Sequence, residues 1–289
     1  MVERTSRVTS RTIRQALEIR SIIEAGSYRT RVGALVEIAE AILRMIDGSQ
    51  VVDSSTADMA SDAVTLPIRR KVEITQEDSV DAVFRLASTG SRVGLLNFAS
   101  GLHRGGGFDL GASAQEEALC RASTLIAALE STRADLFYER NALAEPLFTD
   151  TLIFSPGVPF IRRDGELVAD PVLADVFTLA APRADAAWSR GMAIPATLLY
   201  DRLSGLLAAT QMRSLDHLIL GAWGCGAYAN DSRAVARAFR SALESSVDAP
   251  PSVTFAVLDR SSEREIIGAF EEEFLENGKG TAGSGPPCG

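Results

Sequence analysis

The stretch Val93–Arg121, VGLLNFASGLHRGGGFDLGASAQEEALCR, predicts a strand, a glycine loop and the start of a helix in direct succession. The apolar run at its beginning is typical of a short buried strand. The three glycines at 105–107 can take positive φ and let a ligand approach their N–H groups closely. Ser113 and Glu116 then form the S-x-x-E pattern that opens a helix. This order predicts an anion site with carboxyl groups beside it.

The two adjacent acids, Glu116 and Glu117, allow a structural and a catalytic interpretation. Glu116 can serve only as the capping partner of Ser113, and Glu117 can pair with Arg121 for about 0.2–0.5 kcal/mol. Burial and a bound anion would instead penalise the charged form and keep one carboxyl protonated near neutral pH. General acid catalysis requires such a protonated group. The residues alone leave both interpretations open.

A second glycine-rich segment, Gly221–Asp231, follows the apolar run at 217–220 and precedes a predicted helix. Its glycines leave N–H groups free to form an anion-binding concavity. Tyr228 would offer an aromatic face to a sugar or a base. The alternative is a tight turn with a core aromatic residue. Ligands collect at the carboxyl ends of strands in open α/β sheets, so we expect this segment and the glycines at 105–107 to meet.

The order N-F-A-S, G-G-G, seven residues, Q-E-E and L-C-R-x-S-T-L resembles the bacterial-type poly(ADP-ribose) glycohydrolases, which are macrodomains. The resemblance covers most of the chain through further segments: Gly26–Tyr28, Phe137–Tyr138, Phe154–Val158, Ala180–Pro182 and Gly221–Gly226. The chain departs from the family at Arg104, where Pro is usual, and at Leu110, where Asn is common. Both departures concern loop shape and substrate fit more than chemistry.

The resemblance implies a glycohydrolase that cleaves the ribose–ribose bond of poly(ADP-ribose) and releases ADP-ribose. It assigns general acid and base catalysis to Glu117, and orientation of the scissile ribose to Glu116. Gln115 would support the loop, and Asn97 would lie near the distal ribose. The positions expected to hold the rest of the substrate are Gly105, Gly106, Gly107, Gly224, Cys225, Gly226, Ala227 and Tyr228, the last at a position where the family usually has a stacking Phe.

Strands that alternate with helices predict an α/β fold with a largely buried sheet; the resemblance makes it a macrodomain-like α/β/α sandwich with a mixed sheet. We expect a helical extension and connector over residues 1–66, a catalytic core over 67–277 and a disordered tail over 278–289. The expected strands are Val72–Thr75, Val93–Phe98, Leu152–Phe154, Val176–Leu179, His217–Gly221 and Val253–Leu258. The expected helices are residues 4–46 with a break at Gly26–Ser27, Asp78–Ala87, one from Gln115 through Leu129, Ala193–Thr210, Ser232–Leu243 and Glu263–Glu276.

Composition excludes several classes of protein. A formal net charge of −9 argues against a general grip on nucleic acid, so a polyanionic substrate would be held locally. Neither of the two lysines lies in a glycine loop, and the two histidines lack partners at metal-ligand spacing, so we expect no Walker-type site and no metal. The resemblance implies no cofactor either. No apolar run is long enough to span a membrane, and three cysteines suit a reducing compartment, so we expect a cytoplasmic protein. We also expect a monomer.

Three other functions compete with turnover of the polymer. The first is an ADP-ribose-binding macrodomain without turnover, against which the intact Glu116–Glu117 pair argues. The second is a hydrolase of single ADP-ribosyl units on protein or nucleic acid. The third is an interaction protein with a helical extension whose glycine loops are only turns. Incubation with labelled polymer and with mono-modified protein separates all three.

Overall fold

The computed structural model describes residues 2–53, 70–211, 213–246 and 249–276. Its centre is a seven-stranded sheet of order β3-β6-β7-β5-β8-β9-β4. The strands from β7 to β4 in that order are parallel, and β6 and β3 are antiparallel to their neighbours. The bounds are β3 (Gln50–Asp53), β4 (Lys71–Thr75), β5 (Val93–Ala99), β6 (Thr151–Arg163), β7 (Glu166–Ala180), β8 (His217–Leu220) and β9 (Ser252–Ala256).

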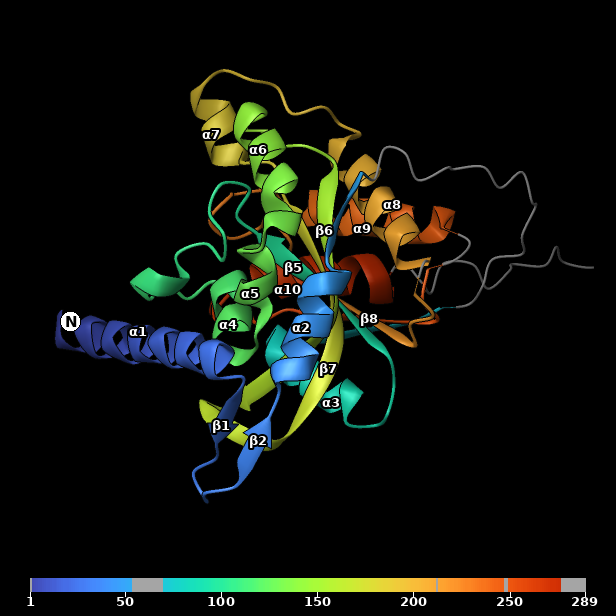
Figure 1. Ribbon diagram of the computed structural model, residues 1–289. Coiled ribbons are helices and arrows are strands. Elements are labelled where there is room, and N and C mark those ends of the chain that lie inside the picture. The colour runs from blue at the N-terminus through green and yellow to red at the C-terminus, as the bar shows by residue number, and fades with distance from the viewer. Residues whose placement is uncertain (1, 54–69, 212, 247–248, 277–289) are drawn as a thin grey trace, which may run out of the picture.

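Helices cover both faces of this sheet, and Figure 1 shows α4 and α5 on one side of it and α8 and α9 on the other. The first face carries α1 (Val2–Ala25), α2 (Ala39–Gly48), α3 (Ser79–Ala87), α4 (Gln115–Ala122), α5 (Leu125–Leu129) and α6 (Asp135–Leu143). The second face carries α8 (Leu198–Gln211), α9 (Ser232–Ser245) and α10 (Glu265–Glu271), which continues as a π-helical turn over Glu272–Glu276. The short helix α7 (Ala184–Ser189) lies beside α6 (Figure 1).

The alternating direction of side chains along the central strands explains why helices pack on both faces of the sheet. In β5, Leu95 packs into the core on the side of α1–α6, and Leu96 packs into the core with α8–α10. Val176 and Phe177 divide in the same way in β7. Successive side chains of a strand point to opposite faces, and a strand that is apolar on both must be covered on both. The predicted α/β/α sandwich with a mixed sheet is confirmed.

The N-terminal region differs from the predicted pair of helices. After α1 the chain forms a hairpin of β1 (Ser27–Arg29) and β2 (Leu35–Glu37), so the helix expected to resume directly after Gly26–Ser27 is wrong for residues 28–37. Gly26 ends α1 with a φ of +67°. The Tyr28 hydroxyl donates to the Val168 carbonyl oxygen at 2.8 Å, which ties the hairpin to β7. This contact spans 140 residues, so local periodicity could not reveal it.

The expected connector and the expected strands near 152 and 176 also differ. Residues 50–53 belong to β3 and pair with β6 at the edge of the main sheet, whereas a loop was expected there. The strands β6 and β7 form one long hairpin that continues past Pro156 and Pro171, with register shifts that accommodate the irregular positions. The rest of the connector, the boundary at residue 66 and the tail at 278–289 lie outside the described residues, so the division into domains stays a prediction.

The long helix expected from Gln115 to Leu129 is two helices, α4 and α5. Ser123 has extended backbone between them, and the Thr124 N–H donates to the Pro159 carbonyl oxygen of β6 at 3.1 Å. The helix expected from Ala193 begins only at Leu198. None of the helices in the described part of the chain combines the length and the apolar character needed to cross a membrane.

Candidate active site

The strands β5 and β8 are parallel neighbours, and their carboxyl ends border a cavity of about 800 Å³. The first glycine loop, Gly105–Gly107, follows β5, and the second glycine loop, Gly221–Asn230, follows β8. Gly106 and Gly107 of the first loop line the cavity together with residues 222–228 of the second. The loops therefore meet, as the strand order requires of two connections that leave adjacent strands at the same edge.

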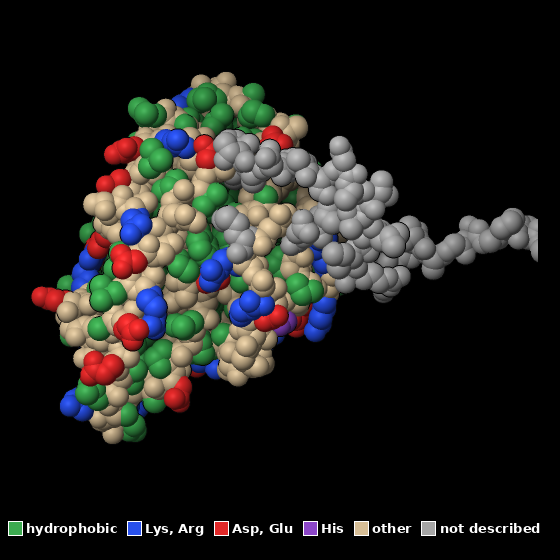
Figure 2. Space-filling view, turned by 45° about the vertical axis from the view of Figure 1, so that its right-hand side comes forward, with side chains coloured by type: hydrophobic (Ala, Val, Ile, Leu, Met, Phe, Trp, Pro, Cys, Tyr) green, Lys and Arg blue, Asp and Glu red, His purple; other side chains and the backbone are tan. Residues whose placement is uncertain are grey.

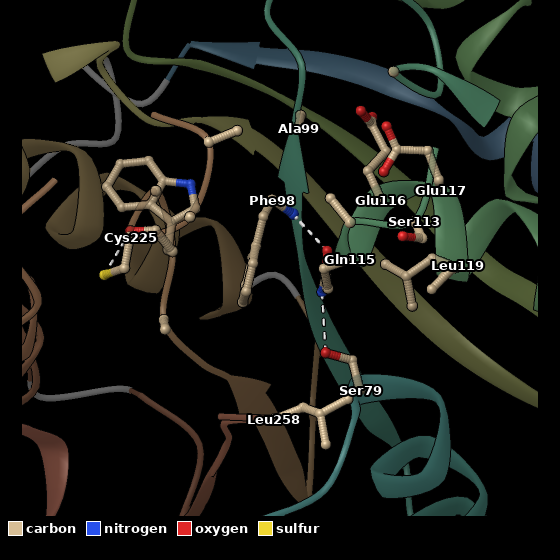
Figure 3. A pocket seen from close by; sticks show the side chains of 18 of the residues that line it. Ser79, Phe98, Ala99, Ser113, Gln115, Glu116, Glu117, Leu119, Cys225 and Leu258 are labelled. Carbon is tan, nitrogen blue, oxygen red and sulfur yellow. Dashed lines mark hydrogen bonds between the residues drawn. The ribbon is translucent and has the colours of Figure 1, made fainter. Parts of the chain in front are cut away.

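Glu117 presents one free oxygen at this cavity. Its carboxyl group is 7% exposed on the first turn of α4, and Oε1 accepts a hydrogen bond from the Gly107 N–H at 2.8 Å. The other oxygen, Oε2, is buried and accepts no hydrogen bond within the described chain. Figure 3 shows the carboxyl groups of Glu116 and Glu117 side by side at the end of β5, with Cys225 across the strand. A buried acceptor without a partner is costly, so this oxygen is suited to a ligand.

Glu116 is held on both of its oxygens. Oε1 accepts from Asn97 Nδ2 at 3.2 Å, and Oε2 accepts from the Ser100 N–H at 2.9 Å. Burial raises the pKa of this carboxyl from 4.5 to about 8, and the charge of Glu117 acts in the same direction, while the two hydrogen bonds oppose it. Burial therefore favours the neutral form of Glu116, the carboxyl group beside Glu117.

Neither structural role expected for the two acids is present. The N-cap of α4 is Ala114, without a side-chain cap, so the capping box between Ser113 and Glu116 does not form. Within the described residues no ion pair joins Glu117 to Arg121, whose Nη1 donates instead to the Ala112 carbonyl oxygen at 2.6 Å. The carboxyl groups therefore do not serve as ordinary helix-terminus and helix-surface side chains.

The first glycine loop passes directly over the carboxyl pair. Gly105 and Gly106 have φ of +70° and +59°, a region that L side chains rarely adopt. A Cβ on Gly106 would overlap Glu117 Oε1 and lie 3.1 Å from Glu116 Oε2. Backbone conformation and close approach both require glycine here.

The second glycine loop is held by buried, uncharged donors. Trp223 is fully buried, and its Nε1 donates to the Leu179 carbonyl oxygen at 2.9 Å. Asn230 Nδ2 donates to the Pro182 and Gly224 carbonyl oxygens at 2.8 and 3.0 Å. The N–H groups of Gly226 and Ala227 donate to no acceptor within the described chain, so they are available to a ligand.

Two side chains of the second loop face the cavity. Burial raises the pKa of the Cys225 thiol to about 12, so this cysteine is a neutral wall residue near neutral pH. Tyr228 is half-buried, and its ring lies 6.0 Å from the Phe148 ring and 5.8 Å from the Arg183 guanidinium. One face of the loop thus combines free N–H groups with an aromatic ring.

The remaining predicted residues divide between lining and support. Gln115 lines the cavity and fastens α4 to β5, because Oε1 accepts from the Phe98 N–H at 2.9 Å (Figure 3) and Nε2 donates to the Leu96 carbonyl oxygen at 2.9 Å. Asn97 is fully buried behind Glu116, and Gly105 packs against Ile126. These last two do not line the cavity, so their direct contact with substrate stays a prediction.

Sequence motifs did not indicate a third wall of the cavity. Residues 78–80 after β4 and residues 257, 258 and 260 after β9 complete it. The signal that could have located them is topological, since β4 and β9 end at the same edge as β5 and β8. His103, one of the two histidines, is exposed and also lines the cavity. In the described residues no group of three or more His, Cys, Asp or Glu side chains could hold a metal ion.

Comparisons with known proteins agree on one family. A sequence model of the family described as microbial-type PARG, catalytic domain, matches residues 16–163. The poly(ADP-ribose) glycohydrolase of Thermomonospora curvata is 33% identical with a TM-score of 0.83, over 91% of this chain and 99% of that one. Its complex with the inhibitor ADP-HPD is 33% identical with a TM-score of 0.80, over the same 91% and 99%.

A structure from a second organism is also similar. The poly(ADP-ribose) glycohydrolase of Deinococcus radiodurans in complex with ADP-ribose is 37% identical with a TM-score of 0.74, over 81% of this chain and 97% of that one. A search of the curated proteins finds no significant match. Family and fold comparisons thus point to the same class of enzyme.

Proposed function

This chain belongs to the microbial-type poly(ADP-ribose) glycohydrolases, and on that premise we propose which of its residues carry out the reaction. The protein is a glycoside hydrolase that cleaves the ribose–ribose bonds of poly(ADP-ribose). We assign general acid and base catalysis to Glu117 and orientation of the scissile ribose to Glu116. The observation that carries this assignment is Glu117 Oε2, a buried carboxyl oxygen at the cavity without a partner in the described chain.

Glu117 would act twice in one turnover. In the first step Glu117 Oε2 donates a proton to the glycosidic oxygen, so that the ribose–ribose bond breaks as charge of oxocarbenium type develops on the anomeric carbon. In the second step the resulting carboxylate takes a proton from water, whose oxygen attacks that carbon. Because the Gly107 N–H holds Oε1, the carboxyl keeps one orientation while Oε2 exchanges the proton.

Glu116 would position the ribose and limit the charge of the site. Its two oxygens are fixed by Asn97 and Ser100, so the carboxyl can meet a ribose hydroxyl without turning. Since burial raises its pKa to about 8, a proton remains on it near neutral pH. A neutral carboxyl next to Glu117 reduces the repulsion of a diphosphate substrate.

We assign the grip on the ADP-ribose unit chiefly to the second glycine loop. The free N–H groups of Gly226 and Ala227 can bind the diphosphate, and the Tyr228 ring can stack on a sugar or base. In the first loop the N–H groups of Gly106 and Gly107 are already taken, by the His103 carbonyl oxygen and by Glu117. The face drawn in Figure 2 carries acidic and basic side chains interspersed, so this face is not a continuous basic surface.

We further assign the enzyme to the cytoplasm, acting as a monomer on polymer without a cofactor. Cys120 and Cys225 are both unpaired, which supports a reducing compartment. The cavity lies between loops of one chain, so one copy supplies every residue assigned to catalysis. Light scattering of the active protein would test the monomer.

The test of this assignment is Glu117→Gln, with Glu116→Gln as its matched comparison. Glu117→Gln keeps the size and the acceptor for the Gly107 N–H but removes the acid, so release of ADP-ribose in single turnover should fall about 10²–10⁴-fold. Its affinity for ADP-ribose by calorimetry should be retained. Glu116→Gln should reduce both turnover and affinity, because it disturbs the placement of the ribose. A Glu117→Gln protein that cleaves polymer near the parent rate would exclude this mechanism.

A further inference from the structure

The placement of the first glycine loop determines the geometry of the proposed acid. The Gly107 N–H holds Glu117 Oε1, and Gly106 lies in direct contact with both carboxyl groups. Two internal hydrogen bonds shape the turn, from the Gly106 N–H to the His103 carbonyl oxygen at 2.9 Å and from the Phe108 N–H to the Gly105 carbonyl oxygen at 3.1 Å. These bonds do not fasten the turn to the rest of the fold. The glycines themselves contact the fold only through the Gly107 N–H and the packing of Gly105 on Ile126, so side-chain attachment must come from the flanking residues.

Phe108 and its neighbours provide the downstream attachment. Phe108 is 1% exposed and packs into the core, with the Arg20 guanidinium 5.6 Å from its ring. Arg20 of α1 also pairs with Asp109 at 2.7 Å and with Glu130 at 2.8 Å. The loop is therefore fixed where it ends.

Arg104 makes the corresponding contacts immediately before the glycines. Its Nη1 donates to the Leu129 carbonyl oxygen at 2.7 Å, and its Nη2 pairs with Asp135 Oδ1 at 2.7 Å. The guanidinium carbon lies 4.5 Å from the centre of the Tyr138 ring. The side chain is 31% exposed and is not part of the cavity wall, so it points away from the site.

The chemistry of these contacts favours a fixed position for Arg104. Leu129 is the last residue of α5, where the unpaired carbonyls carry partial negative charge and attract a cation. The planar guanidinium satisfies a carbonyl and a carboxylate in its plane while its face covers an aromatic ring, which an ammonium group could not do in one geometry. Hydrogen bonds to the Leu129 and Ser131 carbonyl oxygens (2.7 and 3.5 Å) and to Asp135, together with the ring contact, hold the residue that directly precedes Gly105.

We propose that Arg104 is a positioning residue for hydrolysis: it fastens the first glycine loop to the end of α5 and to α6, and so keeps the Gly107 N–H on Glu117. The proposal rests on the role assigned to Glu117 above. Proline, usual at this position in the family that the sequence resembles, restricts φ through its own ring. Arg104 instead fixes the chain through its side chain.

The experiment compares Arg104→Met with Arg240→Met. Arg240 is 29% exposed, and it likewise donates to a carboxylate (Glu244, 2.8 Å) and to a carbonyl oxygen (Glu273, 2.8 Å), but on α9 away from the cavity. Arg104→Met should lower kcat on poly(ADP-ribose) about tenfold or more, because small misplacement of a catalytic group is costly. KM should change less than threefold, because the second loop keeps its free N–H groups. The melting temperature should fall no further than in Arg240→Met, whose kcat should stay at the parent value.

A double variant shows whether the effect runs through Glu117. If Arg104 acts by placing that carboxyl, Arg104→Met in the Glu117→Gln background should reduce the residual rate less than twofold. Arg104→Lys keeps the positive charge but loses the planar guanidinium group, so its kcat should lie between those of the parent and Arg104→Met. Should Arg104→Met not fold, Asp135→Asn, which weakens the contact of Arg104 with this half-exposed carboxylate, should lower kcat alone by severalfold.

Three results would overturn the proposal. The first is a kcat of Arg104→Met within twofold of the parent, and the second is a change in KM without a fall in kcat. The third is a fall in the residual rate of Glu117→Gln, on adding Arg104→Met, as large as the fall that Arg104→Met causes in the parent. Failure of the catalytic assignment gives a different pattern, because Glu117→Gln alone would then keep its activity.

Discussion

The two glycine loops of the site are similar in composition and opposite in construction. Charged side chains outside the first loop, Arg104 and Arg20, hold it through partly exposed ion pairs. The second loop is held from within, by the buried and uncharged donors of Trp223 and Asn230. The first loop uses its Gly107 N–H on Glu117, whereas the second leaves N–H groups free. Glycine lets the backbone of both loops lie close to the carboxyl groups or to a ligand. The residues around each loop determine whether its N–H groups bind Glu117 or stay free for the ligand.

The largest effect predicted from this comparison belongs to Gly106→Ala. The new Cβ would overlap Glu117 Oε1, at a φ of +59° that alanine rarely adopts, so the carboxyl or the loop must move. We expect hydrolysis to fall about 10²-fold or more and the affinity for ADP-ribose to fall less. Single-turnover cleavage and calorimetry on the same preparation measure the two quantities.

A matched control is Gly268→Ala in α10. A Cβ there meets no atom within 4 Å, and alanine is favoured over glycine in a helix by about 0.5–1 kcal/mol. This variant should keep full activity and unfold at the same or a higher temperature. Equal activity in Gly106→Ala and Gly268→Ala would show that the first loop does not set the position of the acid.

A smaller effect, on stability and binding, is predicted for Asn230→Ala in the second loop. The change leaves the Pro182 and Gly224 carbonyl oxygens without the Asn230 amide, so we expect a loss of about 1–3 kcal/mol in the free energy of unfolding. The affinity for ADP-ribose should weaken severalfold, while single-turnover cleavage at saturating polymer should stay within about threefold of the parent. Urea unfolding, calorimetry and rapid-quench kinetics measure the three quantities.

The control for this variant is Arg233→Met. Arg233 lies nearby on α9, and the change removes its exposed ion pair with Glu272. Exposed pairs contribute about 0–1 kcal/mol, so stability and affinity should hardly change. If Asn230→Ala reduced the rate of cleavage at saturating polymer as much as is expected for Gly106→Ala, the proposed roles would be wrong. Those roles are placement of the acid by the first loop and binding of the ligand by the second.

The central site could be predicted because it is nearly continuous in sequence. The strand, first loop and carboxyl pair occupy residues 93–121, and each has a local pattern. The strand order then explains why the second loop, over a hundred residues later, lies opposite. The apolar runs in β5 and β7 are typical of strands covered on both faces, so they similarly predicted a largely buried sheet.

What could not be predicted depends on contacts between distant segments. The S-x-x-E pattern suggested a capping box, but the Glu116 oxygens bind Asn97 and Ser100, 19 and 16 residues earlier. Leu35 and Val36 fit the apolar stripe of a helix, but they lie in β2, which pairs with β1. The Tyr28 hydroxyl attaches this hairpin to β7. Arg104 suggested only a change of loop shape, because its partners Leu129 and Asp135 belong to later helices.

The most direct test of the account is a crystal structure of the Glu117→Gln protein with a short poly(ADP-ribose) chain. We predict that the side-chain amide at position 117 lies about 2.6–3.2 Å from the glycosidic oxygen, the reach of a proton donor. The Gly107 N–H should still contact the other atom of that amide, and the diphosphate should lie on the Gly226 and Ala227 N–H groups. A glycosidic oxygen within reach of Glu116 and beyond about 5 Å from position 117 would contradict the assignment of the acid.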